Sequence, residues 1–381
     1  MKLRVKLDFG GGREPMEVGV LSEAGRELAF EFAETFLASG LDLAPFRLPR
    51  RPGPTVFAHH PGLETFGLFE DSLPDGWGRM IMDRVFQSRH GRKPTVLELL
   101  AGVGANGRGA LTYEPADEEL VESAGEFDLA RLAESAMEES ASAEALARLA
   151  KAGGSSGGAR PKAYVGYDPA TGRFCAERRD LPPGFEHWLV KFNTRLDGAD
   201  AGEREFAYYR MAIAAGANME PCRLVETSVG RFFMTRRFDR TRDGGRLHMA
   251  SAAGLLHADF RIPGEDYALL FRLADALTRD YGVKTELFRR AALNVLGHNR
   301  DDHLRNFSFL MDAQGKWTLA PFYDFTWAEG PNGWQTLSVA GEGRNPGIAD
   351  LERLAARVGL EGKAAKAIID RCRQSVCERG I

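Results

Sequence analysis

Three polar residues in the last third of the chain have the spacing that phosphoryl transfer uses. Asp301 is followed five residues later by Asn306, and Asp324 comes eighteen residues after that, beyond a short apolar stretch. An aspartate in the first position can orient an accepting hydroxyl and take its proton. Asparagine and aspartate oxygens suit Mg²⁺ that bridges phosphates. The spacing therefore predicts Asp301 as a catalytic base and Asn306 and Asp324 as metal ligands.

A glycine-rich run, residues 153–162, precedes this cluster in the sequence. Glycines let backbone N–H groups approach phosphate oxygens closely. The run is not a Walker A loop, because Lys162 is not followed by Ser or Thr and the expected order is helix, loop, strand. A flexible linker would have a similar composition. Its place upstream of a strand lysine and of Asp301 favours ATP-phosphate binding, through Gly153, Gly154, Ser156, Gly157, Gly158, Ala159 and Lys162.

Lys191 lies in a predicted strand, residues 187–193. The apolar face of that strand would be formed by Trp188, Val190 and Phe192. A lysine on the opposite face must reach an anion or extend to water. In a kinase this lysine contacts the α- and β-phosphates and pairs with a helix glutamate, for which Glu205 is the best-placed candidate and Glu203 the second. The alternative is a surface lysine on an edge strand.

Two other interpretations of the Asp301 cluster remain open. A metal hydrolase would use as ligands His298, Asp301, Asp302, His303 and Asp324. That interpretation leaves Asn306, Lys191 and the glycine-rich run without a role. In a purely structural interpretation Asp301 or Asp302 caps a helix, which explains one aspartate but not the spaced set. The ordered combination favours a kinase, in which His303 and Arg305 would steady the loop or the transferring phosphoryl charge.

Composition limits the class of protein. The chain has 381 residues, enough for two or three domains, with a formal net charge of −4 and a pI near 6.1. An autonomous nucleic-acid-binding protein would show a basic excess. No stretch approaches about 18 apolar residues and no signal-peptide pattern is present, so no membrane association is expected. The four cysteines lack metal-ligand or disulfide spacing, so we expect reduced thiols and a cytoplasmic location.

The first part of the chain, residues 1–115, is predicted to form a small α+β subdomain. Short strands are expected at residues 2–9 and 16–21. A helix that follows residues 73–77 would carry on one face Met80, Ile81 and Val85. Residues 116–150 are acidic and alanine-rich, which is typical of a helical connector with solvated faces.

The remaining chain is predicted to hold the nucleotide-binding and catalytic parts. Residues 151–245 are expected to form an ATP-binding N-lobe part, with strands at 163–167, 173–177, 187–193 and 231–239 and a helix at about 203–215. Gly216 would end that helix. Residues 246–381 are expected to form a helical C-lobe, in which an amphipathic helix ends at Gly297, just before the catalytic loop.

These motifs resemble those of the HipA family of toxin serine/threonine kinases. The strongest match is Asp301-Asp-His-Leu-Arg-Asn-Phe-Ser-Phe309 followed by Leu319-Ala-Pro-Phe-Tyr-Asp324. Further matches are residues 67–77, 107–113, 153–162, 237–240 and 341–346, so the resemblance covers nearly the whole chain. It implies an α+β, protein-kinase-like two-lobed fold with a small N-terminal α+β subdomain and a mainly helical C-lobe.

The resemblance also implies ATP and Mg²⁺ as cofactors. By this analogy Asp301 is the base and Lys191 touches the phosphates, while Asn306 and Asp324 carry the metal. His303 joins the ATP-binding set, and the hinge backbone from Arg236 to Phe238 contacts adenine. A family hinge often carries an acidic residue where this chain has Arg236, but hinge contacts are mostly backbone, so ATP binding should survive.

Regulation and partners follow from the same resemblance. Family members autophosphorylate a serine of the glycine-rich loop, which ejects the loop; Ser155 falls on that position and Ser156 is the alternative. A phosphate dianion there would repel ATP. The family works beside a HipB-type antitoxin, so contact with DNA is expected through that partner, and a protein substrate is expected in the translation machinery. A catalytically weak HipA-like protein that acts mainly as an antitoxin or transcriptional partner is the alternative.

Overall fold

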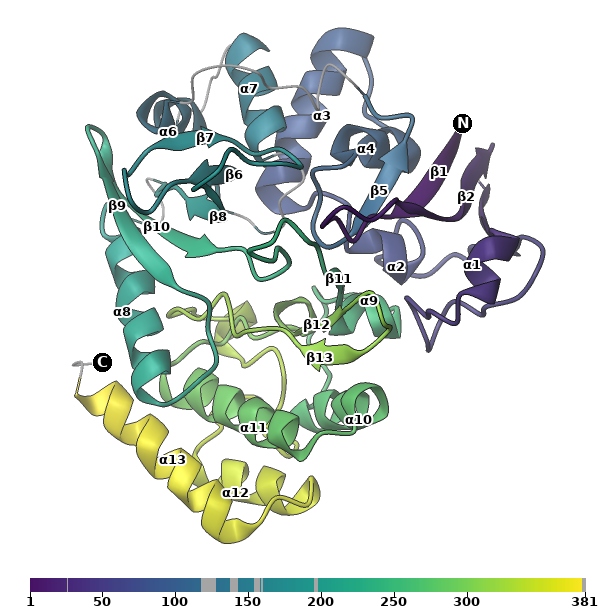
Figure 1. The fold of residues 1–381 in the computed structure, drawn as a ribbon. Helices are drawn as coiled ribbons and strands as arrows, with labels where there is room; N and C mark the ends of the chain where they lie inside the picture. The colour runs from purple at the N-terminus through teal and green to yellow at the C-terminus, as the bar shows by residue number, and fades with distance from the viewer. Residues whose placement is uncertain are drawn as a thin grey trace. The chain divides into compact units, whose positions relative to one another are not determined.

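The computed structural model describes residues 1–25, 27–117, 128–137, 143–153, 158, 160–194 and 198–378. The chain divides into two compact units. Unit 1 comprises residues 1–203, 222–250 and 311–315, and unit 2 comprises residues 204–221, 251–310 and 316–381. Unit 1 contains two five-stranded sheets, whereas unit 2 is mainly helical (Figure 1).

The first sheet of unit 1 is antiparallel, with the strand order β4-β3-β2-β1-β5. Its strands are β1 (Lys2–Leu7), β2 (Met16–Ala24), β3 (Glu27–Phe32), β4 (Thr55–Val56) and β5 (Leu111–Glu114). In β1 every second residue is buried, as the two-residue period of a strand requires. Aromatic rings pack edge to face on this sheet, among them Phe30, Phe66 and Phe69. The strands predicted at residues 2–9 and 16–21 are therefore present.

Four helices accompany this sheet: α1 (Glu34–Ala38), α2 (Gly67–Glu70), α3 (Gly76–His90) and α4 (Val96–Val103). Helix α4 begins with a capping box in which Thr95 and Glu98 satisfy each other's backbone N–H groups. Helix α3 is the predicted helix after residues 73–77. Its residues Ile81 and Val85 are buried as expected, but Met80 is 39% exposed, so the prediction for Met80 was wrong.

Two further helices lie in or next to the predicted connector: α6 (Leu129–Met137) and α7 (Ala143–Gly153). Helix α7 packs against α3 (Figure 1). The end of α7 at Gly153 is where the glycine-rich run begins, so this run starts from a helix that is held on the N-terminal part of the chain.

The second sheet of unit 1 is also antiparallel, with the order β7-β6-β8-β10-β9. Its strands are β6 (Lys162–Tyr167), β7 (Phe174–Ala176), β8 (Glu186–Lys191), β9 (Cys222–Thr227) and β10 (Gly230–Arg236). Strand β8 lies inside the sheet, between β6 and β10. Its predicted apolar face is wholly buried, with exposed fractions of at most 1% for Trp188, Val190 and Phe192.

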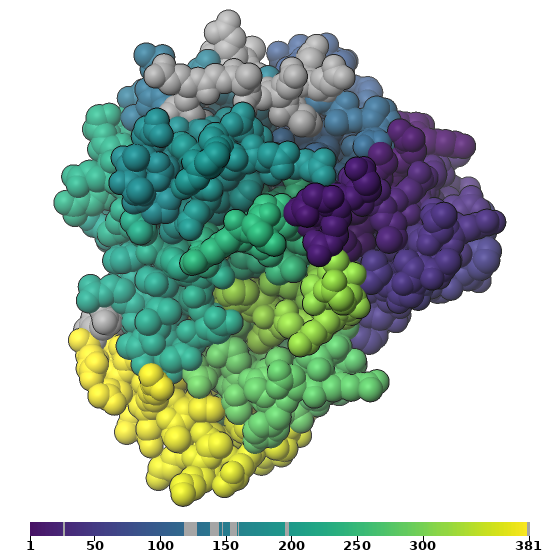
Figure 2. All heavy atoms as spheres, in the orientation of Figure 1, coloured from purple at the N-terminus to yellow at the C-terminus, as the bar shows by residue number. Residues whose placement is uncertain are grey.

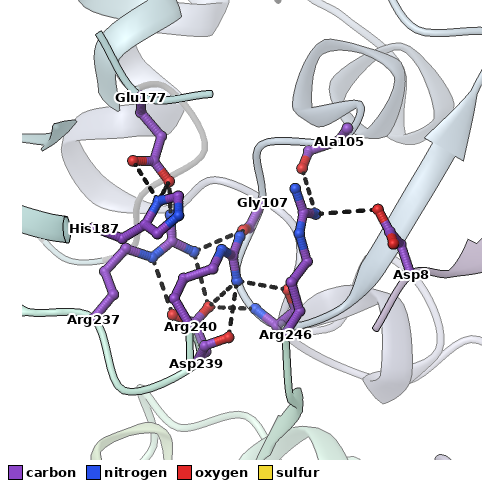
Figure 3. Close-up of polar contacts among 10 residues, drawn as sticks. Asp8, Ala105, Gly107, Glu177, His187, Arg237, Asp239, Arg240 and Arg246 are labelled. Atoms are coloured by element: carbon purple, nitrogen blue, oxygen red, sulfur yellow. Dashed lines mark hydrogen bonds and ion pairs between the residues drawn. The ribbon is translucent and has the colours of Figure 1, made fainter. Parts of the chain in front are cut away.

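A buried cluster of charges follows strand β10. The carboxylate of Asp239 accepts hydrogen bonds from Arg237 Nη2 (2.8 Å), Arg240 Nη1 (2.9 Å) and Gly109 N (2.7 Å). Both guanidinium groups also donate to Gly107 O at 2.9 Å, and Figure 3 shows Asp239 lying between them. Burial alone would raise the pKa of Asp239, but the two positive charges outweigh it and hold that pKa below its usual range.

Arg246 makes a second set of contacts between the same segments (Figure 3). Its guanidinium donates to Ala105 O at 2.8 Å and lies 4.0 Å from the carboxylate of Asp8, which also pairs with Arg179 at 3.1 Å. The backbone N–H of Arg246 donates to Phe9 O at 2.7 Å. Residues 237–246 are thus fastened to the N-terminal sheet and to the loop before β5.

Unit 2 is built on the long helices α10 (Tyr267–Thr278), α11 (Tyr281–Leu296), α12 (Ile348–Arg357) and α13 (Gly362–Cys377). Helix α13 packs along α11 and α12, and Figure 2 shows the C-terminal residues (yellow) beside the green part of the chain. The short helix α9 (Ala252–Leu256) follows strand β11 (His248–Ser251), and strands β12 (Ser308–Met311) and β13 (Trp317–Leu319) pair with each other.

Helix α8 (Ala201–Ala214) runs from unit 1 into unit 2 and is followed by Gly216, whose φ of +80° suits a C-cap glycine. None of the helices in the described ranges combines the length and the apolar character needed to cross a membrane. All four cysteines are free thiols.

Asp239→Ala should destabilise unit 1, because it leaves the buried guanidinium groups of Arg237 and Arg240 without their shared counter-charge. We expect the free energy of unfolding to fall by about 3–5 kcal/mol, measured by urea denaturation of the full-length protein. As a control, Glu226→Ala removes an exposed carboxylate 3.8 Å from Arg231 and should leave the urea midpoint unchanged. Equal midpoints for all three proteins would contradict the stabilising role of Asp239.

Candidate catalytic and nucleotide-binding site

The loop after α11 holds the predicted catalytic residues of unit 2 in a closed arrangement. Asn306 Nδ2 donates to the carbonyl oxygen of Asp301 at 2.8 Å, and Asn306 N donates to His303 O at 2.9 Å. A single 3₁₀ turn, η1 (Leu304–Asn306), completes the loop. The Asn306 side chain is mostly buried, with 8% of the residue exposed. The amide N–H₂ group of Asn306 is therefore engaged inside the loop.

Asp324 follows β13 with a φ of +58°, a left-handed conformation that is uncommon outside glycine. Desolvation by the surrounding protein raises the pKa of Asp301; His303 opposes this shift, whereas the charge of Asp324 adds to it. The Asp301 side chain is 61% exposed, so solvent screens part of the effect. The charges of the Asp301 and Asp324 carboxylates therefore interact. That Asn306 and Asp324 bind Mg²⁺ stays a prediction.

A buried arginine fixes the segment that leads to Asp324. Arg290 on α11 is 0% exposed, donates to Ala320 O at 2.8 Å and pairs with Glu286 at 3.0 Å. Its guanidinium lies 5.3 Å from the ring centroid of Phe322. These contacts hold residues 320–322 on helix α11, and they thereby determine the position of Asp324 two residues later.

The neighbouring carboxylate, Asp302, is 0% exposed and is satisfied by neutral donors. Its oxygens accept from the Tyr267 hydroxyl, from Gln335 Nε2 at 2.8 Å and from Leu337 N at 3.2 Å. Burial raises the pKa of Asp302 to about 6, and the hydrogen bonds lower it by less. Asp302 therefore faces away from solvent and ties the catalytic loop to residues 335–337.

This polar network extends toward Asp324. Asn299 Nδ2 donates to Asn294 Oδ1 at 3.0 Å and to the carbonyl of Asp324 at 3.4 Å, while Asn294 Nδ2 donates to the Tyr267 hydroxyl at 2.9 Å. Gln335 Nε2 also donates to Asn299 O at 2.8 Å. The network thus joins the backbone beside the predicted base to the backbone of the predicted metal ligand.

The network also bears on the metal-hydrolase interpretation. Across the described ranges no group of three or more His, Cys, Asp or Glu side chains is placed to hold a metal ion. Asp302, one of the five ligands that interpretation requires, is engaged in the network instead. Those five side chains do not converge.

His303 and Arg305 share an aromatic neighbour. The ring centroids of His303 and Phe260 are 4.8 Å apart, and the Arg305 guanidinium lies 5.0 Å from the Phe260 centroid. His303 Nε2 lies 3.9 Å from Asp301 Oδ1, close enough to favour the carboxylate form of Asp301 when the imidazole is protonated. His303 is therefore held beside the predicted base rather than at a ligand position of its own.

In unit 1 the sheet brings two lysines together. Lys162 on β6 and Lys191 on β8 are direct cross-strand partners, each only 6% exposed, so their side chains leave the same face of the sheet. A Cβ atom on Gly158 would lie 2.7 Å from Lys162 Nζ. The sheet therefore places Lys162 and Lys191 side by side, and Lys162 lies beside the backbone of Gly158. The edge-strand alternative for Lys191 is wrong, because β8 is internal.

Other predicted residues are placed as follows. Arg236 ends β10 with its guanidinium 3.9 Å from Glu186, and Phe238 is half-buried. Glu205 is 2% exposed in unit 2, whereas Lys191 belongs to unit 1, so their pairing stays a prediction. Glu203 pairs with Arg231 at 2.8 Å. Five residues of the glycine-rich run lie outside the described residues: Gly154, Ser155, Ser156, Gly157 and Ala159.

Sequence reasoning missed two features of the site. It considered Asp302 only as a metal ligand or a cap, and it gave residues 335–337 no role. The signal that could have revealed the first is the run of polar residues Asn294, Asn299 and Asp302 at the end of an apolar helix. Nothing in the local sequence indicates that Gln335 reaches back to this loop.

Residues 154–379 match the model of the HipA-like C-terminal domain, and residues 14–114 match that of the HipA N-terminal domain. The HipA protein of Shewanella oneidensis MR-1, solved with HipB and its operator DNA, is 19% identical over 99% of this chain and 90% of that chain, with a TM-score of 0.73. The predicted α+β, HipA-type fold is therefore confirmed.

A second solved structure, the Helicobacter pylori proinflammatory kinase CtkA, is 12% identical over 52% of this chain and 85% of that chain. The TM-score of this match is 0.36. No curated protein matches this chain.

Asp302→Asn should change how stability depends on pH. The folded-state pKa of Asp302 is about 6, above the value of about 3.9 for an unfolded aspartate. Between these values the folded state binds more protons, so the wild-type protein loses stability as pH rises through this window. Asparagine does not ionise, so the variant should gain stability relative to the wild type by up to about 3 kcal/mol from pH 4 to 7.

Urea denaturation at a series of pH values measures this difference. The substitution also alters hydrogen bonds, which shifts the free energy of unfolding by a constant amount at every pH. This shift does not affect the test, because only the change of the difference with pH is compared. Asp275→Asn, which alters a half-exposed carboxylate paired with Lys284 at 3.2 Å, is the matched control and should show no such trend. A difference between Asp302→Asn and wild type that is constant across the window would refute the raised pKa.

Proposed function

Since this chain belongs to the HipA family, we propose that it is an ATP-dependent serine/threonine protein kinase of the HipA toxin type. The observation that carries the proposal is the closed loop in which Asn306 donates to the Asp301 carbonyl at 2.8 Å, with the charge of Asp324 close enough to shift the pKa of Asp301. Phosphoryl transfer to a hydroxyl needs a base for the hydroxyl proton and oxygen ligands for the cation that bridges the phosphates, and Asp301, Asn306 and Asp324 can supply them.

The roles of the unit 2 residues follow from their chemistry. Asp301 accepts the proton of a serine or threonine hydroxyl while the oxygen of that hydroxyl attacks the γ-phosphorus of ATP. The bond between the γ-phosphorus and the β–γ bridging oxygen breaks, and ADP is released. A raised pKa makes Asp301 a better proton acceptor than an ordinary aspartate. Asn306 Oδ1 and the Asp324 carboxylate would hold Mg²⁺, which supplies charge neutralisation at the phosphates.

The unit 1 residues are assigned to the nucleotide. Lys162 and Lys191 would contact the phosphates, with the backbone of the glycine-rich loop around Gly158 covering them. The backbone from Arg236 to Phe238 would receive adenine, and Glu205 would support Lys191. His303, next to Asp301, would stabilise the charge on the transferring phosphoryl group.

Partners and regulation are proposed on the family alone. The Shewanella protein was solved as a complex of HipA, HipB and operator DNA, which supports a HipB-like antitoxin as partner of this chain and DNA contact through that partner. We further propose a cytoplasmic toxin that phosphorylates a protein of the translation machinery. Autophosphorylation of Ser155, or of Ser156, would switch it off by adding negative charge where ATP phosphates bind.

Asp301→Ala and Asp324→Ala should each abolish phosphoryl transfer, because the first removes the base and the second a metal ligand. We expect a loss of about 10²–10⁴-fold in the transfer of ³²P from ATP to the protein itself or to lysate proteins with Mg²⁺ present. Asp275→Ala, on helix α10 of the same unit, should retain wild-type activity. If the wild-type protein transfers no phosphate, the kinase proposal is wrong, and a catalytically weak HipA-like protein that acts as a transcriptional partner explains the sequence better.

Ser155→Ala should remove the main autophosphorylation site, whereas Ser156→Ala should leave it in place. Mass spectrometry of the protein after incubation with ATP and Mg²⁺ locates the phosphate. The pair of variants is matched, since both remove one hydroxyl from the same loop. Phosphate on Ser156 that persists in Ser155→Ala and disappears in Ser156→Ala would assign the site to Ser156 instead.

A further inference from the structure

The motif Leu73-Pro-Asp-Gly-Trp77, at the start of helix α3, has no role in the proposed reaction, yet it contacts the glycine-rich loop. Asp75 precedes α3, but its side chain makes no capping hydrogen bond to that helix. Its Oδ1 atom instead accepts a hydrogen bond from the backbone N–H of Gly158. The backbone N–H of Trp77 donates to Gly158 O at 3.1 Å. Gly158 is thus held through both of its backbone polar groups.

The backbone of Gly158 has a conformation that fits this double contact. Its φ is +94°, which side-chain-bearing residues rarely adopt, and a Cβ atom would lie 2.7 Å from Lys162 Nζ. The residue that Asp75 holds is therefore the one that lies against a lysine assigned to the ATP phosphates. The two contacts therefore hold Gly158 beside Lys162 of the second sheet.

The anchor itself is rigid. Trp77 is 6% exposed, so the first turn of α3 is packed in the core of unit 1. Helix α7, which leads into the glycine-rich run, packs on α3. One helix of the N-terminal part therefore contacts both the helix that enters the run and Gly158 near its end.

Anchoring has a direct thermodynamic consequence. A glycine-rich segment loses more conformational entropy on ordering than any other kind of chain. If part of that loss is incurred in the free protein, the nucleotide does not have to supply it on binding, so affinity rises. A hydrogen bond to an ionised carboxylate is also stronger than one between neutral groups.

We propose that Asp75, together with the Trp77 N–H group, is a positioning residue that holds the glycine-rich loop for phosphate binding. The N-terminal α+β part of the chain then contributes to nucleotide affinity without touching the nucleotide. This inference rests on the proposed function, because it assigns the loop to ATP phosphates.

Asp75→Ala in the full-length protein tests the inference. We expect its dissociation constant for MgATP to rise about tenfold, the effect of losing one charge-assisted hydrogen bond. Asp75→Asn keeps an oxygen acceptor without the charge, so its dissociation constant should lie closer to that of the wild type. The KM for ATP should rise in Asp75→Ala while kcat at saturating ATP stays unchanged, since Asp75 does not contact the reacting atoms.

Thr95→Ala is the matched control. It removes the N-cap hydrogen bond of the nearby helix α4 and costs about 1 kcal/mol of stability, but it leaves the Gly158 contacts intact, so MgATP affinity should not change. Hydrogen exchange without nucleotide gives a second readout: exchange at the Gly158 amide should accelerate in Asp75→Ala and not in Thr95→Ala.

The outcomes separate the two proposals. Wild-type protein that binds no MgATP would overturn the proposed function. Wild-type binding with an equal or lower dissociation constant in Asp75→Ala would overturn this inference alone. A dissociation constant that rises equally in Asp75→Ala and Thr95→Ala would also overturn it, because the effect would then come from general destabilisation.

Discussion

The wholly buried carboxylate of Asp302 is the constraint on which the loop that carries the proposed base depends. A buried carboxylate must be fully hydrogen-bonded, and Asp302 obtains its donors from Tyr267, Gln335 and Leu337. Tyr267 lies in one stretch of unit 2, and Gln335 and Leu337 lie in another, so the hydrogen bonds of one side chain hold two segments against the loop. Asp301 directly precedes Asp302 in the chain, and its carboxylate faces outward from the loop that Asp302 holds in place. The geometry proposed for the base is thus a consequence of a neighbouring group that takes no part in the reaction.

Unit 1 meets the same requirement in another way. Asp239 is also buried, but its charge is balanced by Arg237 and Arg240, and the cluster includes the backbone of Gly107 and Gly109. This cluster begins at the residue after β10, where the hinge is proposed. Together with the contact between Asp75 and Gly158, it means that the N-terminal sheet and its helices support the segments proposed to bind nucleotide at two separate places. The small N-terminal part is therefore integral to unit 1.

Much of this organisation could be predicted from sequence, and the rest could not, for a physical reason. Short-range patterns were sufficient for the α+β class, for the buried face of β8 and for helix α3, because two-residue and 3.6-residue periods are local. The spacing of Asp301 and Asn306 was equally readable, since their contact closes within five residues. Met80 was assigned to the wrong face, as the period alone does not say how wide the buried stripe is. Tyr267, a partner of Asp302, and Gly109, a partner of Asp239, lie 35 and 130 residues away, so only the tertiary fold reveals these contacts.

The most direct test of the central claim, that these loops bind ATP through Mg²⁺, is an equilibrium titration of the full-length protein with ATP in the presence of Mg²⁺ and again in EDTA. We predict saturable binding of one ATP per chain that weakens strongly in EDTA and in the Asn306→Ala variant, because Asn306 and Asp324 act through the metal. Binding of equal strength in EDTA, or no saturable binding at all, would contradict the claim.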